Sequence, residues 1–269
     1  MPSLPLLVRA CHPEPTAAVT ALAATLAAAA GANPLLVGAA FLSGQLSIGW
    51  SNDWLDAARD RTVGRSDKPT VRGLSVPVLR TAALLAATAC VPLSLLLGWR
   101  AGVVHLVAVA SGWAYNLRLK ATAVSFLPYA LSFGLVPSVI SLAAADRFAP
   151  WWATTAGALL GMGAHGANVL PDLDDDLATG VVGLPHRLGR RLTALLSGLL
   201  LVLATVALAV GPGLRLVGAI AVALSVVVFA IGLRLGRRPG SRAAFLSVIV
   251  VALVDVALLV AQGADLVRG

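Results

Sequence analysis

The chain consists almost wholly of long apolar runs that are interrupted by charge clusters, proline and glycine. A helix needs about 20 mostly apolar residues to cross a bilayer. The runs that meet this requirement lie near 16–32, 34–55, 77–98, 101–117, 122–144, 150–170, 192–210, 213–235 and 243–263. The pattern predicts an all-α integral membrane protein with nine transmembrane helices, in a single domain over residues 1–269.

The composition supports this prediction. Of the 269 residues, 58% are hydrophobic and only 12% are charged. The mean hydropathy is +0.89, which is far above the value that a water-soluble domain sustains. The apolar runs are continuous and do not alternate with polar residues, so the pattern excludes a transmembrane β-barrel.

The positive charges are distributed unevenly between the two predicted membrane faces. Sixteen of the 20 Lys and Arg residues lie at the amino terminus or after spans 2, 4, 6 and 8, and four lie on the other face. Cytoplasmic loops carry the excess of Lys and Arg, so the chain is expected to cross the cell membrane several times, with the amino terminus cytoplasmic and the carboxyl terminus outside. Contacts with anionic membrane lipids account for the net charge of +8, so no nucleic-acid partner is expected. The excess of arginine over lysine is typical of a bacterial source.

A cluster of carboxylates follows the second predicted span. It reads NDWLDAARD over residues 52–60, and at about 100° per residue Asn52, Asp56 and Asp60 share one helix face, with Asp53 beside Asp56. Like charges three and four residues apart destabilise a helix, so this pattern requires compensating cations. Magnesium, held by carboxylates and substrate phosphates, is the usual compensation.

A second cluster, DLDDD over residues 172–176, follows the sixth span on the same predicted face. Asp172 and Asp176 lie one turn apart, whereas Asp174 is expected to face away, toward Arg187 and Arg190. Either cluster alone would be interpreted as a solvated acidic loop. Two clusters at corresponding helix ends favour one shared metal site for a phosphate-bearing ligand.

At these motifs the sequence resembles the UbiA superfamily of intramembrane prenyltransferases, whose two aspartate motifs face each other across a central cavity. NDWLDAARD resembles the first motif and DLDDD the second. The resemblance extends to ARDRTVGRSDKPTVRG, SGWAYNLRLK and DLATGVVGLPHRLG, and so covers most of the chain. The sequence departs from the family pattern at Pro171, where an arginine is often found, and in its extra acids Asp174 and Asp175.

The resemblance implies a set of site residues. Magnesium, the expected cofactor, would be held by Asn52, Asp53, Asp56, Asp60, Asp172 and Asp176. Arg118 and Lys120 would contact the diphosphate directly, with Asn52 as a further contact and Tyr115 near the leaving group. Lys68 and Arg72 would cap the site. Asp56, Asp172, Tyr115 and Lys120 would be the catalytic residues.

The implied function is the Mg²⁺-dependent transfer of a prenyl group from an allylic diphosphate to a hydrophobic acceptor, expected to be aromatic as in quinone-type biosynthesis. One alternative is a UbiA-type terpene cyclase, which uses the diphosphate alone. A transporter whose carboxylates bind a cation is an alternative of another class.

Four polar residues inside the predicted spans were interpreted individually. Asp255 in the ninth span is expected to bond to a neighbouring helix, and His105 is expected to be a packing residue. Gln45 and His165 each lie about two turns from a motif, where either could reach an acceptor. A hydrogen bond between helices is the role expected of both.

Overall fold

The structure is a computed structural model that describes residues 3–66, 68–236 and 243–268. Within these residues the chain is helical and contains no β-strand. Arg237, Arg238 and Arg242, which were counted on the cytoplasmic face, lie outside the described residues.

In the described part of the chain, nine helices have 18 residues or more, and each corresponds to one predicted span. They are α2 (Pro13–Ala30), α3 (Pro34–Val63), α4 (Val76–Leu95), α5 (Trp99–Leu117), α6 (Leu127–Ala145), α7 (Trp151–Val169), α9 (Leu184–Val210), α10 (Leu216–Leu235) and α11 (Ala243–Ala261). The short elements are α1 (Ser3–Ala10), η1 (Leu119–Ala121), α8 (Leu173–Ala178) and η2 (Gly263–Leu266). Five of the described helices, α4, α6, α9, α10 and α11, are long and apolar enough by themselves to cross a membrane.

The ends of the first long helices follow from local sequence. Gly31 ends α2 with φ 84°, a left-handed conformation that glycine adopts at little cost. The side chain of Asn33 then accepts hydrogen bonds from the N–H groups of Leu35 and Leu36, both at 3.1 Å, and so caps α3. Helix α3 continues to Val63, beyond the predicted end at residue 55, because the first aspartate motif is itself helical.

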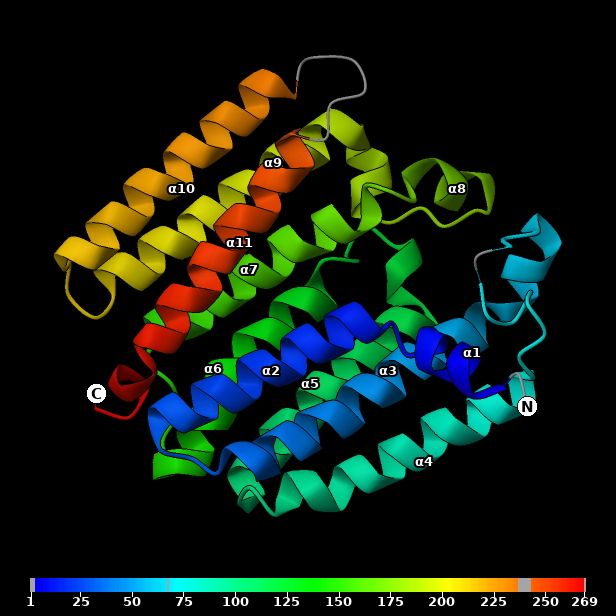
Figure 1. Cartoon of the computed structure of the whole chain (residues 1–269), viewed down its shortest axis with the longest axis horizontal. Coiled ribbons are helices and arrows are strands. Elements are labelled where there is room, and N and C mark those ends of the chain that lie inside the picture. The colour runs from blue at the N-terminus through cyan, green and yellow to red at the C-terminus, as the bar shows by residue number, and fades with distance from the viewer. Residues whose placement is uncertain (1–2, 67, 237–242, 269) are drawn as a thin grey trace.

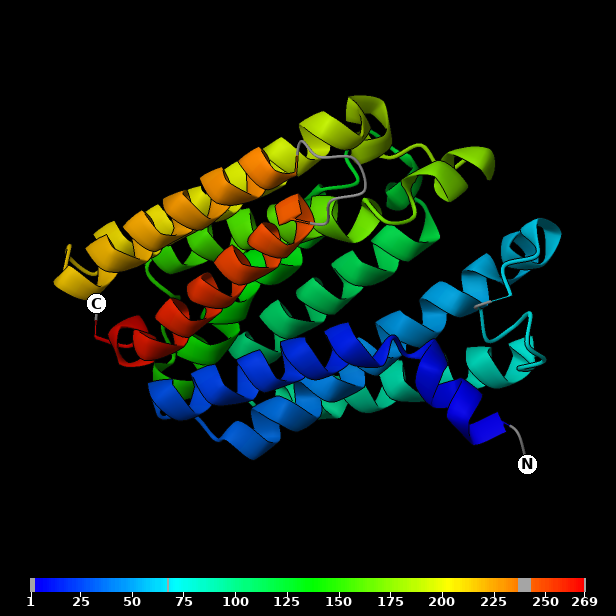
Figure 2. The same ribbon diagram turned by 45° about the horizontal axis from the view of Figure 1, so that its top comes forward.

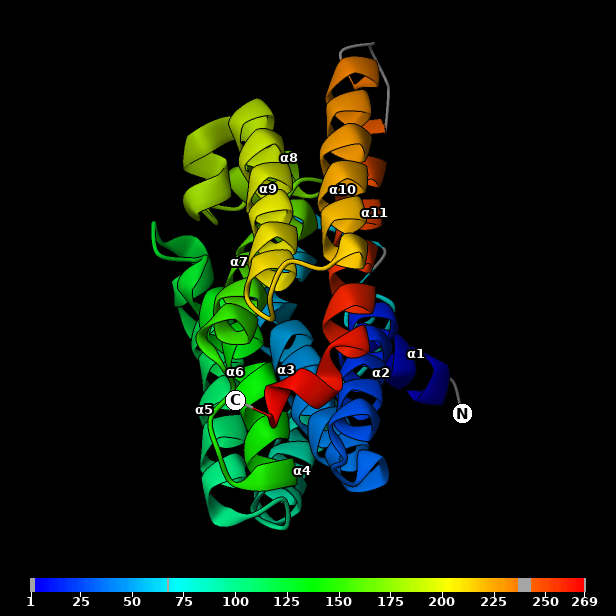
Figure 3. The ribbon, with the colours of Figure 1, turned by 90° about the vertical axis from the view of Figure 1, so that its left-hand side faces the viewer.

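The helices run lengthwise past one another, and the bundle has two distinct ends. The end of α3, α8 and the amino-terminal α1 all lie at one end, whereas the carboxyl terminus lies at the other (Figures 1 and 2). Helices α9, α10 and α11 pack together, and α7 joins them to α6 (Figure 3). The two aspartate motifs therefore meet at the same end of the bundle.

Small residues bring α6 and α7 close together beside the site. A Cβ atom at Gly161 would lie only 2.3 Å from the backbone oxygen of Tyr129, and one at Gly157 only 2.5 Å from that of Phe133. Glycine four residues apart on a helix is a common device for close helix packing in membranes. This contact fixes the height of Tyr129 and Phe133 relative to α7.

Candidate active site

A cavity of about 410 Å³ opens where the two aspartate motifs meet. Its lining comes from α2, α3, α5, α6, α7, α8 and α9 and the segments between them. Asn52 and Asp56 line it from the first motif, and Asp172 and Asp176 line it from the second. The fold thus brings together two clusters that are more than a hundred residues apart in the sequence.

Asp56 is the most heavily paired carboxylate of the lining. One of its oxygens accepts a short hydrogen bond from Lys120, and the other accepts one from Arg59 at 3.0 Å. Both cations also line the cavity. Burial lowers the pKa of the Lys120 ammonium, an effect that the adjacent Asp56 carboxylate opposes.

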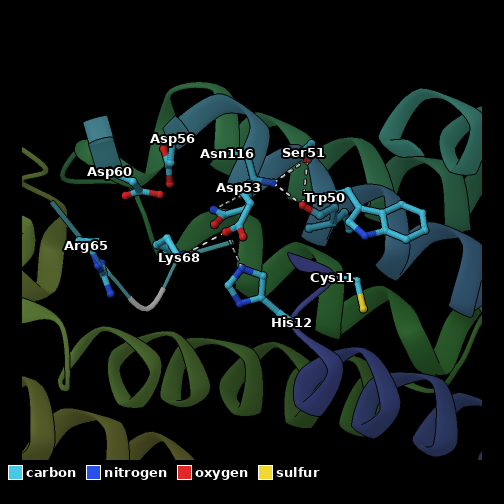
Figure 4. A network of polar contacts seen from close by, with 12 residues as sticks. Cys11, His12, Trp50, Ser51, Asp53, Asp56, Asp60, Arg65, Lys68 and Asn116 are labelled. Atoms are coloured by element: carbon cyan, nitrogen blue, oxygen red, sulfur yellow. Dashed lines mark hydrogen bonds and ion pairs between the residues drawn. The ribbon is translucent and has the colours of Figure 1, made fainter. Parts of the chain in front are cut away.

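Asp53 lies behind the lining and holds two residues that reach the cavity. The Nζ atom of Lys68 donates to its Oδ1 at 3.0 Å, and the Nε2 atom of His12 lies 3.2 Å from the same oxygen. Figure 4 shows Asp53 pointing between Lys68 and His12. Since Asp53 is only 1% exposed, this ion pair anchors the loop after α3 and the start of α2 to the motif helix.

Asn52 is oriented by a second asparagine on α5. Its Nδ2 donates to Oδ1 of Asn116 at 3.1 Å. Asn116 in turn donates to the backbone oxygen of Ile48 at 2.8 Å and to the hydroxyl of Ser51 at 2.9 Å. Because its amide nitrogen is committed to Asn116, Asn52 presents its carbonyl oxygen as the atom available to a metal ion.

In the second motif, Asp172 and Asp176 are joined by the first backbone hydrogen bond of α8, at 2.8 Å. Arg65, from the loop after α3, lies 3.6 Å from Asp172 and so links the two motifs across the cavity. The Nε2 atom of His186 lies 3.4 Å from Asp176. Burial raises the pKa of Asp176, whereas His186 opposes this rise.

The extra acid Asp174 faces away from the cavity, as its spacing predicted. Its carboxylate accepts a hydrogen bond from Arg190 at 2.9 Å, and its side chain is 80% exposed. Helix α7 ends at Val169, before Pro171, and α8 starts a new direction at Leu173. This break places Asp172 and Asp176, but not Asp174, toward α3.

The donors at this end of the cavity suit magnesium, which takes carboxylate and amide oxygens. Both oxygens of Asp60 are buried and accept no hydrogen bond, and burial raises the pKa of this carboxyl group. The Nε atom of Arg59 lies 4.0 Å from one of these oxygens, too far for a hydrogen bond, so both oxygens remain available to a metal ion. Among the described residues, however, no three His, Cys, Asp or Glu side chains converge closely enough to hold an ion, because Asp53, Asp56 and Asp172 turn toward basic side chains instead.

Of the four basic residues predicted to contact or cap the diphosphate, two line the cavity and two do not. Lys68 and Lys120 line the cavity, whereas Arg72 and Arg118 are exposed and do not line it. Five residues that line the cavity were not predicted from the sequence as site residues, namely His12, Arg59, Arg65, Asn116 and His186. All but His12 stand within the quoted motif segments, so their segments were identified but not their roles.

Aromatic side chains form one wall of the cavity below the carboxylates. The ring of Tyr115 packs edge-on against Tyr129 at 5.2 Å and against His165 at 5.7 Å between centroids. Tyr129 also stacks on Phe133 at 6.3 Å. The Tyr129 hydroxyl accepts a hydrogen bond from Asn168 at 3.3 Å, which keeps the ring in place.

Of the four polar residues inside the spans that were interpreted individually, three form hydrogen bonds and one does not. Asp255 accepts a hydrogen bond from Thr205 of α9 at 2.6 Å, His105 bonds to Ser94 at 2.7 Å, and both are buried, as predicted. The Nε2 atom of His165 lies 3.0 Å from the hydroxyl of Ser125, which precedes α6. The prediction was wrong for Gln45: it lines the cavity, and its amide makes no hydrogen bond to any residue that the structure describes.

Comparison with known proteins identifies a family for the chain. The profile of the UbiA prenyltransferase family matches residues 15–259. No curated protein matches the sequence. The fold is similar to that of a UbiA homolog from Archaeoglobus fulgidus bound to GPP and Mg²⁺, with 17% identity, a TM-score of 0.71, and coverage of 98% of this chain and 100% of that one.

Two further solved structures share this fold. A UbiA homolog from Aeropyrum pernix K1, solved in its apo form, has 19% identity and a TM-score of 0.70, with 93% of this chain and 98% of that one covered. A digeranylgeranylglyceryl phosphate synthase has 15% identity and a TM-score of 0.71, with 99% and 100% covered. At these identities the likeness establishes the fold, and the arrangement of the site rests on this chain's own residues.

Proposed function

Because the chain belongs to the UbiA prenyltransferase family, we propose that it transfers a prenyl group from an allylic diphosphate to an aromatic acceptor, as in quinone-type biosynthesis, with Mg²⁺ as cofactor. The observation that carries this proposal is the cavity itself. Carboxylates of both motifs and four cations gather at one end, and an aromatic wall lies directly below them. The end with the carboxylates and cations suits a diphosphate bound through a metal ion. The other end suits the prenyl hydrocarbon from which the diphosphate departs.

We further propose that all nine long helices cross the cell membrane of a bacterium, with the polar end of the cavity at the cytoplasmic face. The charge asymmetry of the loops supports this orientation, as does the position of both motifs at the end of the bundle that holds α1. The four long described helices that are not apolar enough by themselves are α2, α3, α5 and α7, and each contributes polar residues to the site or lining. Their lower hydropathy therefore reflects the cavity that they enclose.

This orientation predicts one-sided labelling of introduced cysteines. A cysteine at Ser66 should react with a membrane-impermeant thiol reagent only from the cytoplasmic side, and one at Ala145 only from outside. The native Cys11 and Cys90 are both buried, so the background should be low. Labelling of Ser66→Cys and Ala145→Cys from the same side would contradict the nine-span arrangement.

At the polar end, the basic residues of the lining lie where the leaving group would bind. Asn52, Asp56, Asp172 and Asp176 of the lining would hold magnesium, with the buried Asp60 one turn after Asp56 as a further ligand. Asp53 would support Lys68 and His12. When bound there, magnesium neutralises the charge that develops on the departing diphosphate. Lys120, Arg59, Arg65 and Lys68 are within the same lining and add fixed positive charge around it.

Below the leaving group, the residues protect and orient the cation that ionisation produces. The ring faces of Tyr115 and Tyr129 attract positive charge through their quadrupoles. Tyr129 packs against Phe133 and His165, so the wall beside the reacting carbon is made of rings. A shielded allylic cation then reacts with the acceptor and not with solvent.

The test is to supply purified protein with labelled geranyl diphosphate and Mg²⁺, with and without hydroxylated aromatic acceptors, and to identify the products by mass spectrometry. We expect a product that contains both carbon skeletons, together with pyrophosphate release that depends on the acceptor. If cyclic terpenes formed at the full rate without an acceptor, the protein would be a terpene cyclase and not a transferase. The absence of pyrophosphate release under every condition would favour a transport protein.

A further inference from the structure

His186 carries a buried polar atom that has no hydrogen-bond partner. Its side chain is only 2% exposed, and the residue belongs to the lining of the cavity. The Nδ1 atom accepts a hydrogen bond from the N–H group of Gly183 at 3.1 Å, whereas Nε2 makes no hydrogen bond in the part of the chain that the structure describes. A buried polar group without a partner is costly, so this atom is expected to gain a partner when the site is filled.

The hydrogen bond from Gly183 determines what the other ring nitrogen can do. A neutral imidazole has one N–H donor and one acceptor, so with Nδ1 as the acceptor the proton lies on Nε2. A protonated Nε2 can donate a hydrogen bond, but it has no free electron pair for a metal ion. His186 is therefore a hydrogen-bond donor at this site and not a further metal ligand.

Asp176 of the second motif is the carboxylate that faces this donor. Its Oδ2 atom lies 3.4 Å from Nε2, a contact in which the two groups are not aligned for a hydrogen bond. The Asp176 side chain is 17% exposed and also lines the cavity, so its carboxylate has room to turn. A small rotation of this carboxylate would complete the hydrogen bond.

The turn that carries His186 is fixed to the segment before α6. A Cβ atom at Gly183 would lie 2.6 Å from the backbone oxygen of Lys120, so any side chain here would push the two segments apart. The hydroxyl of Ser125 accepts a hydrogen bond from the N–H group of Leu184 at 2.9 Å. The imidazole is therefore held at a fixed position, whereas the carboxylate opposite it can turn.

Building on the magnesium site proposed above, we propose that His186 is a positioning residue whose Nε2–H donates to one oxygen of Asp176 and so turns the other oxygen toward the metal ion. Asp56 and Asp172 each have a basic side chain as neighbour, whereas Asp176 has this imidazole. Hydrogen bonds from outside the ligand shell commonly orient the carboxylates that bind a metal. In this role His186 contacts neither the metal nor the diphosphate.

Two substitutions separate the roles of the two ring nitrogens. In His186→Asn, the shorter side chain can still accept from the N–H group of Gly183 but cannot reach Asp176. In His186→Gln, the longer amide can still donate to Asp176. Binding of inorganic pyrophosphate to the wild type and to each variant is titrated calorimetrically at a series of Mg²⁺ concentrations. Inorganic pyrophosphate has no carbon that could react, so the measurement does not depend on turnover.

We expect the Mg²⁺ concentration that supports half-maximal pyrophosphate binding to rise by about tenfold in His186→Asn, as is usual when a metal ligand loses its hydrogen-bond partner. In His186→Gln it should stay close to the wild-type value. Saturating Mg²⁺ should restore the pyrophosphate affinity of His186→Asn. In an Asp176→Asn background, His186→Asn should have no further effect, because the imidazole acts through that carboxylate.

An unchanged Mg²⁺ requirement in His186→Asn, or an equal rise in His186→Gln, would overturn the proposal. Pyrophosphate binding by the wild type that does not depend on Mg²⁺ would also overturn it. A loss of affinity that saturating Mg²⁺ does not restore would place His186 in direct contact with the diphosphate and contradict the positioning role. If the Mg²⁺ requirement rose as expected in a protein that transfers no prenyl group, the transferase function would be wrong and the positioning of Asp176 would stand.

Discussion

Replacing Asp56 or Asp172 by asparagine is expected to lower the rate of prenyl transfer by at least about a hundredfold. Both side chains line one cavity from opposite motifs, so each should be needed for the same metal diphosphate. Asparagine keeps the shape but loses the charge that balances magnesium. Steady-state rates with geranyl diphosphate, in protein shown to be folded by its elution profile in detergent, measure the effect.

Asp174→Asn is the matched control for this pair of variants. Asp174 belongs to the same motif, but it is exposed and paired with Arg190 at the surface, where an ion pair contributes little to stability. It should retain nearly the full rate. An equal loss in Asp174→Asn and Asp172→Asn would show that the face of α8 has been assigned incorrectly.

Lys120→Met is expected to lower kcat/KM for the allylic diphosphate by roughly a hundredfold, the usual cost of removing one fixed group that stabilises developing charge. Lys120 is paired with Asp56, its side chain is 13% exposed, and it lines the cavity. Arg118 lies two residues earlier, but it is exposed and outside the lining, so Arg118→Met should lose much less. Measured kcat/KM values for the two variants separate these roles.

Arg187→Met provides a further comparison, because Arg187 is an exposed cation near the second motif that does not line the cavity. Its rate should remain close to that of the wild type. If Arg118→Met proved as damaging as Lys120→Met, the diphosphate would have to lie nearer the end of α5 than the cavity indicates.

The sequence predicted the helices well because bilayer thickness and apolar run length are directly linked. The boundary between the first two spans, placed at Asn33 and Pro34, is confirmed by the cap that Asn33 makes. Helical spacing also placed Asp172 and Asp176 together and Asp174 apart. These inferences use only local geometry, which the order of residues determines.

Local helical geometry and the lengths of apolar runs do not predict contacts between distant segments. Nothing local indicates that Asn116 would orient Asn52 across 64 residues, or that His12 would reach Asp53. Arg118 and Lys120 look equivalent in the sequence, but the 3-10 turn after α5 carries only Lys120 into the cavity. Gln45 was expected to bond to another helix, because hydropathy cannot distinguish a cavity wall from a helix interface.

If both aspartate motifs bind one diphosphate through magnesium, the affinity for the diphosphate must depend on the ion and on each motif. Calorimetric titration of the wild type and of Asp56→Asn and Asp172→Asn with geranyl diphosphate, with and without Mg²⁺, measures both dependences. We expect tight binding by the wild type that depends on Mg²⁺, and weak binding by both variants that Mg²⁺ no longer strengthens. Binding of equal strength with and without Mg²⁺ in the wild type, or Mg²⁺-dependent binding that survives in either variant, would show that the two motifs do not share one metal diphosphate.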